Sequence, residues 1–274
     1  MKQADEGRIL KNRSSSALCS AQRLDIVFMD KTFLLRSLFQ LASVGATVFL
    51  AFGVMLWLQP GWLITHLRKQ SPDVLYSVET DEKVVALTID DGPDACGSPR
   101  ILDVLDEYDA HATFFLISEH IPGNEEYVER MVAEGHELGN HLTADEPSIS
   151  LSNGEFEREL LKADQALTEY VDDVRWVRPG SGWYNEEMLA TMEKHDYQCA
   201  LGDAYPYDPQ ISIYWFSAYY VLGNVKPGSV IVLHAYNRRG GRTTKALEII
   251  LPKLAERGYK VVTLSELAGI QAGE

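Results

Sequence analysis

Positive charge is scarce in this sequence. It contains 25 Lys and Arg against 40 Asp and Glu, a formal net charge of -15. Residues 1–36 hold 7 basic and 4 acidic residues, so the remaining 18 basic and 36 acidic residues give the rest of the chain a net charge of -18. An acidic body of this kind repels phosphate backbones, so we expect no nucleic-acid partner.

Cysteine is scarce as well, since the chain has only Cys19, Cys96 and Cys199. Cys96 and Cys199 can pair if the body faces an oxidising compartment, or they can be two unpaired buried thiols, and both alternatives stay open. No internal repeat or low-complexity run is visible. With 274 residues, 46% of them hydrophobic, the chain can form one substantial core.

Residues 37–58 have almost no polar side chains, and Gln40 is the only strongly polar one. About 20 apolar residues cross a bilayer as a helix, which predicts a transmembrane helix here. A core helix would have a polar face, and no small-residue cleavage site of a signal peptide follows. Basic residues precede the segment, so the positive-inside tendency predicts a single-pass membrane protein with a cytoplasmic N-terminus and an extracytoplasmic body.

The rest of the chain divides by pattern. Residues 1–36 are predicted to be a flexible tail, residues 59–79 a linker and residues 80–270 a folded catalytic domain. Within that domain, β-branched runs such as VVALTI alternate with segments such as SPRILDVLDEYD, whose apolar residues recur at helical spacing. This alternation predicts an α/β fold with a parallel sheet, in which chemistry gathers at the carboxyl ends of the strands.

Ionisable residues follow five of the expected strands. They are Asp90 with Asp91, then His141, Arg178, Asp203 and His234. One such residue is usually a helix cap or a turn residue, but five at equivalent junctions favour a shared catalytic site.

A metal site can be assembled from three of the residues in this region. Asp91, His141 and Asp145 offer two carboxylates and one imidazole, a set that suits Zn²⁺ or another first-row divalent ion. The metal would acidify a bound water and polarise a carbonyl group. The sequence therefore predicts a divalent cofactor, with zinc the first choice and cobalt, manganese or nickel as alternatives.

The other residues suit proton transfer. Asp90 is predicted to be the general base, Arg178 the cation that holds it, and His234 the general acid toward a departing amine. Asp203 is the first choice for a carboxylate that tunes His234, with Asp208 as the alternative. Together with the metal, this is the equipment of metal-assisted amide hydrolysis.

Five motifs, in order and approximate spacing, resemble those of the polysaccharide deacetylase family, the NodB homology domain or carbohydrate esterase family 4. They are TIDDGP (88–93), GHELGNH (135–141), RPGSGW (178–183), GD (202–203) and VLH (232–234). The resemblance implies a distorted (β/α) barrel that removes acetyl groups from an amino-sugar polymer such as chitin or peptidoglycan. It also implies that Asp90 is the base, Asp91 and His141 are metal ligands, and His234 is the acid.

The sequence departs from the family at Asp145, which stands where the second metal histidine is expected. A carboxylate can replace an imidazole, so a metal is still expected to bind. Arg238, Arg239 and Arg242 follow the last motif and are interpreted as solvated loop charges, with contact to an anionic substrate as the alternative. The aromatic run of residues 205–220 is expected to supply one or two sugar contacts.

Two functions follow from these patterns. The first is a membrane-anchored, metal-dependent hydrolase that removes acetyl groups from N-acetylated oligo- or polysaccharides. The alternative, suggested by the missing histidine, is a membrane-anchored carbohydrate-binding pseudoenzyme of the same fold.

Overall fold

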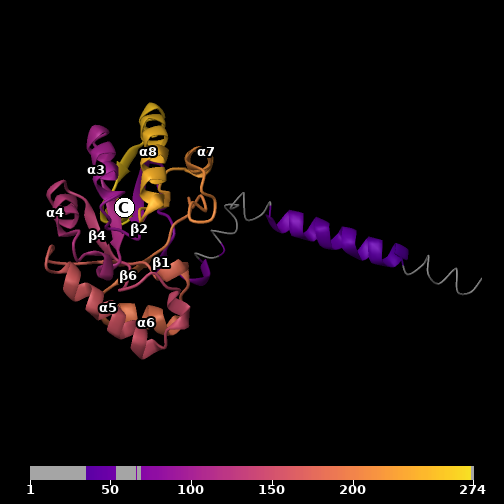
Figure 1. Cartoon of the computed structure of the whole chain (residues 1–274), viewed down its shortest axis with the longest axis horizontal. Coiled ribbons are helices and arrows are strands. Elements are labelled where there is room, and N and C mark those ends of the chain that lie inside the picture. The colour runs from indigo at the N-terminus through magenta and orange to yellow at the C-terminus, as the bar shows by residue number, and fades with distance from the viewer. Residues whose placement is uncertain (1–34, 54–65, 67–68, 273–274) are drawn as a thin grey trace, which may run out of the picture. The chain divides into compact units, whose positions relative to one another are not determined.

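The computed structural model describes residues 35–53, 66 and 69–272, in two compact units, 1–58 and 59–274 (Figure 1). In the first unit, Leu35–Gly53 forms one helix of mean hydropathy 1.5, long and apolar enough to cross a membrane. The hydroxyls of Ser43 and Thr47 donate to backbone carbonyls of the same helix, so these polar groups are satisfied without water. The predicted tail up to residue 34 and the end of the predicted transmembrane helix, residues 54–58, lie outside the described residues.

The second unit is built on a parallel sheet. Its strands are β1 (Val74–Leu75), β2 (Val84–Asp90), β3 (Ala112–Leu116), β4 (Glu137–Asn140), β5 (Trp176–Val177), β6 (Gln198–Ala200), β7 (Val230–His234) and β8 (Lys260–Val262). The order is β1-β6-β5-β4-β3-β2-β7, and β8 pairs with the beginning of β2. Every strand pair is parallel, so the carboxyl ends of the strands share one edge.

The sheet curls toward a closed barrel. Two isolated bridges, Ala204 to Ile231 and Ser77 to Ser229, connect the β1–β6 side of the sheet with β7. These single bridges replace a continuous ladder, which confirms the expected distorted barrel. β1 and the buried residues Tyr76 and Val78 lie within residues 59–79, so part of the predicted linker belongs to the folded body.

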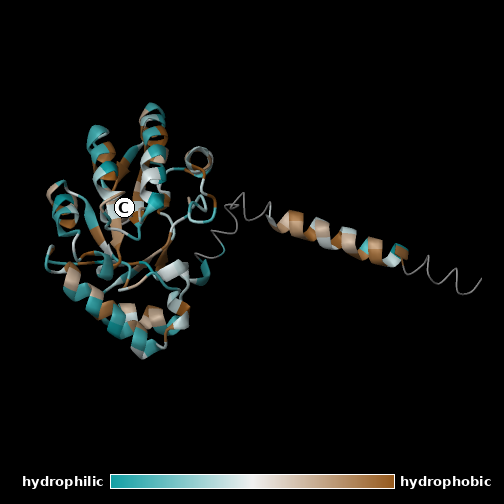
Figure 2. Ribbon diagram, viewed as in Figure 1, coloured by the Kyte–Doolittle hydropathy of each residue, from teal (hydrophilic) through white to brown (hydrophobic). Residues whose placement is uncertain are grey.

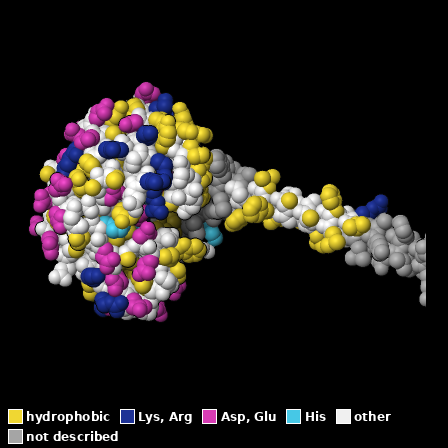
Figure 3. Space-filling model, viewed as in Figure 1, with side chains coloured by type: hydrophobic (Ala, Val, Ile, Leu, Met, Phe, Trp, Pro, Cys, Tyr) yellow, Lys and Arg dark blue, Asp and Glu magenta, His cyan; other side chains and the backbone are white. Residues whose placement is uncertain are grey.

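Seven helices surround the sheet in the described part of this unit. They are α3 (Ser98–Glu107), α4 (Glu125–Ala133), α5 (Asn153–Leu167), α6 (Glu186–Lys194), α7 (Tyr214–Asn224), α8 (Arg238–Glu256) and α9 (Leu264–Ala272). Short 3₁₀ turns occupy Ser118–His120, Ser148–Ser150 and Gly180–Gly182. In Figure 2 the strands are mostly brown while the helices mix teal and brown, as expected for amphipathic helices on an apolar sheet. Acidic side chains are spread over the face seen in Figure 3.

The central position of β2 in the core explains its continuous run of apolar residues. All seven residues of β2 are buried, because β3 and β7 flank it and helices cover it. Both Cys96 and Cys199 are free thiols, so the unpaired alternative is correct, but only Cys199 is buried as that alternative expected, because Cys96 is exposed. Burial raises the pKa of Cys199 to about 12, which keeps it a neutral thiol.

Helix α8 begins earlier than the sequence suggests. Arg238, Arg239 and Arg242, interpreted from the sequence as loop charges, lie within α8. Gly240 lies against Gly97 before α3, and a Cβ at Gly240 would be 2.4 Å from the Gly97 Cα and 2.5 Å from the Ala235 carbonyl oxygen. The glycine therefore permits a close backbone contact that fixes the first turn of α8.

This contact predicts a difference between two neighbouring glycines. Gly240→Ala should lower the free energy of unfolding by about 2 kcal/mol or more, because backbone atoms must move to admit the methyl group. Gly241→Ala is the matched control: its nearest neighbour would be an Arg100 side-chain nitrogen at 3.9 Å. It should be neutral or stabilise by up to about 1 kcal/mol. Urea unfolding of the full chain in detergent measures both, and equal effects would contradict the packing argument.

Candidate active site

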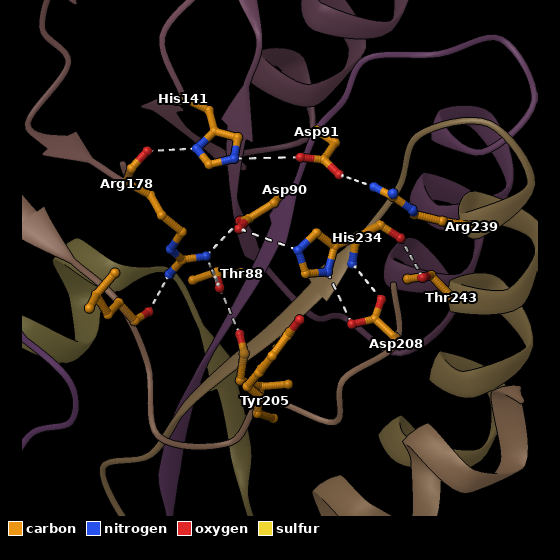
Figure 4. A network of polar contacts seen from close by, with 12 residues as sticks. Thr88, Asp90, Asp91, His141, Arg178, Tyr205, Asp208, His234, Arg239 and Thr243 are labelled. Carbon is orange, nitrogen blue, oxygen red and sulfur yellow. Dashed lines mark hydrogen bonds and ion pairs between the residues drawn. The ribbon is translucent and has the colours of Figure 1, made fainter. Parts of the chain in front are cut away.

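The paired aspartates lie at the carboxyl end of β2, and both are 3% exposed. Asp90 is the last residue of the strand, whereas Asp91 has a φ of +72°, so the chain turns away from the strand direction between them. Figure 4 shows their carboxylates directed toward different partners. The left-handed turn thus lets adjacent carboxylates pair with separate cations.

Arg178 is the cation that holds Asp90. It follows β5, and its Nη1 donates to Asp90 Oδ1 at 2.6 Å and to the Thr88 hydroxyl at 2.8 Å. Its Nε donates to the Ala200 carbonyl at 3.0 Å, Nη2 donates to the Leu201 carbonyl, and the guanidinium carbon lies 4.1 Å from the centre of the Phe115 ring. These contacts place Arg178 and Asp90 together as the sequence predicted.

His234 ends β7 beside Asp90. Its Nε2 is 4.0 Å from Asp90 Oδ2, and Asp208 accepts from both its Nδ1, at 3.0 Å, and its backbone N–H, at 3.0 Å. Burial alone would lower the pKa of His234, but Asp208, with smaller contributions from Asp90 and Asp91, raises it to about 9. The imidazole is therefore held with a proton over the physiological range.

Asp203 does not contact His234. Its carboxylate accepts from the Val230 N–H at 2.9 Å and the Ser229 hydroxyl at 3.2 Å, at the start of β7. His234 lies at the other end of that strand, which is why the first-choice residue was wrong and the alternative, Asp208, is the partner. Burial raises the pKa of Asp203 to about 6.

Asp91 is contacted from two sides. The Nδ1 of His141 donates to the Arg178 carbonyl at 2.6 Å, which leaves Nε2 facing Asp91 Oδ1 at 3.5 Å. On the other side, Arg239 Nη1 donates to Asp91 Oδ2 at 2.7 Å. Burial would raise the pKa of Asp91, but His141, His234 and Arg239 together hold it well below its ordinary range. Burial alone would lower the pKa of His141, but the neighbouring carboxylates of Asp91 and Asp90 raise it above its ordinary value.

The expected three-residue metal set does not form. Asp145 is exposed, and the chain between it and His141 is not helical: it bends at Leu142, where φ is +62°. Four-residue spacing therefore does not place the two side chains on one face. Over residues 69–272, no group of three His, Cys, Asp or Glu side chains is arranged to hold a metal ion. Of the three predicted ligands, only Asp91 and His141 lie close together, and Arg239 already pairs with one oxygen of Asp91. The predicted three-ligand metal site is therefore not formed by these residues.

Arg239 also belongs to this cluster of charged residues, which the sequence did not predict. It was interpreted as a solvated charge, yet its side chain is only 32% exposed and pairs with a buried carboxylate. The available signal was its position five residues after His234, close to the strand end that carries the last motif. Of the aromatic run, the Tyr205 ring lies edge-on to His234 with centroids 5.9 Å apart.

The partnership of Asp208 with His234 predicts a measurable shift. Asp208→Asn should lower the pKa of His234 from about 9 toward its ordinary value of about 6.5, because the largest favourable interaction with the imidazolium is removed. NMR titration of the histidine ring protons measures it. Asp203→Asn is the control and should leave that pKa unchanged, since Asp203 faces Ser229 and Val230. Equal shifts in the two variants would contradict the assignment.

Comparison with known proteins places this arrangement in a family. The model of the polysaccharide deacetylase family matches residues 77–200. A peptidoglycan-N-acetylglucosamine deacetylase of Bacillus cereus is 33% identical over 200 residues, which cover 71% of this chain and 92% of the relative.

Solved structures agree. A family 4 acetyl xylan esterase from Clostridium thermocellum, in complex with a cobalt ion, has a TM-score of 0.64 at 30% identity and covers 69% of this chain and 91% of its own. A family pseudoenzyme from Bacillus anthracis has a TM-score of 0.64 at 28% identity and covers 71% of this chain and 68% of its own. The identity and coverage of the Bacillus cereus relative show that this chain belongs to the polysaccharide deacetylase family.

Proposed function

We propose that this chain is a hydrolase that removes acetyl groups from N-acetylated amino-sugar glycans, chitin-like or peptidoglycan-like. One observation carries the proposal. A carboxylate and an imidazole, Asp90 and His234, lie 4.0 Å apart at the shared strand edge, and each is held by its own buried partner of opposite charge. A protein that only binds sugar has no need of such an acid–base pair.

The pair can move the two protons that amide hydrolysis requires. As water adds to the acetyl carbonyl, Asp90 accepts the proton that the water loses, while Arg178 keeps the carboxylate in place. His234 holds its proton until the carbon–nitrogen bond breaks and then donates it to the departing amine. The products are acetate and the free amino sugar. Tyr205, edge-on to His234, offers a ring against which a sugar face can pack.

The sequence predicts a divalent ion, with zinc as the first choice. In this chain Asp91 and His141 would be its ligands. When bound, such an ion acidifies water and polarises a carbonyl. Asp145 is too exposed to complete the set, so we expect weak binding. The cobalt ion in the esterase relative supports a cation role in the family, without identifying the ion used here.

We also propose that the helix Leu35–Gly53 anchors the protein in a membrane, with the N-terminus cytoplasmic and the catalytic body outside. Its length and mean hydropathy of 1.5 support a membrane helix. The excess of basic residues before it supports the orientation, and a glycan substrate outside the cytoplasm is consistent with the peptidoglycan deacetylase relative.

The carbohydrate-binding pseudoenzyme stays the second candidate because of one observation. Arg239 contacts Asp91, the carboxylate expected to bind metal. A pseudoenzyme of the same family shares the fold, so the fold alone does not decide between the two functions.

Replacement of Asp90, the proposed base, distinguishes the hydrolase from the carbohydrate-binding pseudoenzyme. Asp90→Asn should reduce acetate release from N-acetylated chitooligosaccharides or peptidoglycan by about 100-fold or more, because the proton acceptor is lost. The full chain in detergent is assayed, with circular dichroism to verify folding. Asp145→Asn is the matched control and should retain activity, since Asp145 is exposed. Retained turnover in Asp90→Asn would remove the proposed base, and sugar binding without turnover in the wild type would favour the pseudoenzyme.

The acid role of His234 predicts a pH dependence. A group with a raised pKa keeps its proton below that value, so kcat/KM should fall as pH rises through about 9. Asp208→Asn should move this alkaline limb to lower pH. A profile without an alkaline limb between pH 8 and about 10, measured with the same substrates, would contradict an acid role for His234.

A further inference from the structure

The geometry points to Arg239 as a built-in cation of this site. We propose that its guanidinium neutralises Asp91 at the place where the sequence predicts a divalent ion, and that an ion can bind Asp91 and His141 only when Arg239 moves away. The inference concerns the charge balance of the resting protein and does not depend on whether the chain hydrolyses a glycan.

The buried charges show why a cation is required there. Asp90 and Asp91 are adjacent and each is 3% exposed, so both carboxylates need compensation within the protein. Arg178 is committed to Asp90, and its other nitrogens donate to carbonyl groups. Asp91 has His141 at 3.5 Å on one oxygen and Arg239 at 2.7 Å on the other, and the arginine is the closer partner.

Arginine provides a permanent charge, because its guanidinium does not lose its proton in proteins. With Arg239 in place, Asp91 Oδ2 is already engaged in a charge-assisted hydrogen bond. A divalent ion would have to displace this bond and bring a second positive charge toward a guanidinium. Metal binding is therefore weakened by two features: Asp145 does not complete the ligand set, and Arg239 already pairs with Asp91.

Arg239 is positioned by the same loop that carries Asp91. The ring of Tyr236 stacks on His120 with centroids 3.9 Å apart and planes at 5°, and His120 Nδ1 donates to the Asp91 carbonyl at 2.8 Å. The backbone N–H of Asn237, which has a φ of +57°, donates to Asp94 Oδ2 at 2.7 Å.

These contacts attach the first turn of α8 to the β2–α3 loop, and the Gly97–Gly240 contact tightens the junction. The backbone from which Arg239 reaches Asp91 is therefore fixed against the loop that carries Asp91. The 32% exposure of the Arg239 side chain nevertheless leaves it a path to swing toward solvent.

Metal titration tests the proposal without any substrate. The chelator-treated full chain in detergent is titrated with Zn²⁺ by calorimetry and with Co²⁺ by visible absorption. Arg239→Met, which keeps most of the apolar stem, should bind Zn²⁺ at least about tenfold more tightly than the wild type, a gain of about 1.4 kcal/mol. Arg238→Met is the matched control, because Arg238 is exposed at the neighbouring position, and it should bind like the wild type.

Two further variants make the result decisive. Asp91→Asn combined with Arg239→Met should abolish the gain, which would place the ion at Asp91. If Arg239→Met folds poorly, Arg239→Gln removes the charge while keeping a hydrogen-bond donor, and it too should bind more tightly than the wild type. Zinc affinity that is the same in the wild type and in the folded Arg239 variants would overturn the proposal. Because acetate release is measured separately, a protein without activity can still support or overturn it.

Discussion

The site depends on one constraint: two consecutive carboxylates are buried at the end of a buried strand. Each must be matched by a cation, since an unpaired charge in such a place is strongly unfavourable. The left-handed backbone at Asp91 separates the two requirements by sending the carboxylates in different directions. Arg178 then serves Asp90, and Arg239 with His141 serves Asp91.

The same constraint ties the site to the curl of the sheet. In the strand order, β3 and β4 separate β2 from β5, yet Arg178 after β5 reaches both Thr88 and Asp90 on β2. It can do so because the sheet bends toward closure, as the bridges from the β1–β6 side to β7 indicate. Figure 4 shows the Arg178 side chain reaching Asp90 and Thr88. The ion pair therefore links strands that are not neighbours, and a change in curvature would separate Asp90 from Arg178.

The sequence predicted most of the site residues that lie at strand ends and failed where loops set the direction of a side chain. Asp203 is the exception, because it follows β6 yet contacts the start of β7. Asp90, Asp91, His141, Arg178 and His234 converge because parallel strands bring their carboxyl ends to one edge, and the strand patterns were readable. Asp208 and Asp145 lie in irregular segments, where spacing does not fix direction. Asp208 reaches His234 from a loop, whereas the bend at Leu142 leaves Asp145 exposed. Helix α7 overlaps the aromatic run of residues 205–220, and its aromatic residues carry little helical periodicity that could predict it.

Arg239 and a divalent ion are alike in charge balance and unlike in chemistry. A guanidinium neutralises a carboxylate and donates hydrogen bonds, but it has no vacant coordination position at which to acidify water. Among the described residues, the hydrogen bonds that join Asp90 to Arg178 and His234 to Asp208 do not involve Arg239. The hydrogen bonds of these two pairs therefore do not require Arg239. The charge that faces Asp91 still matters to His234, because Asp91 contributes to the raised pKa of that imidazole.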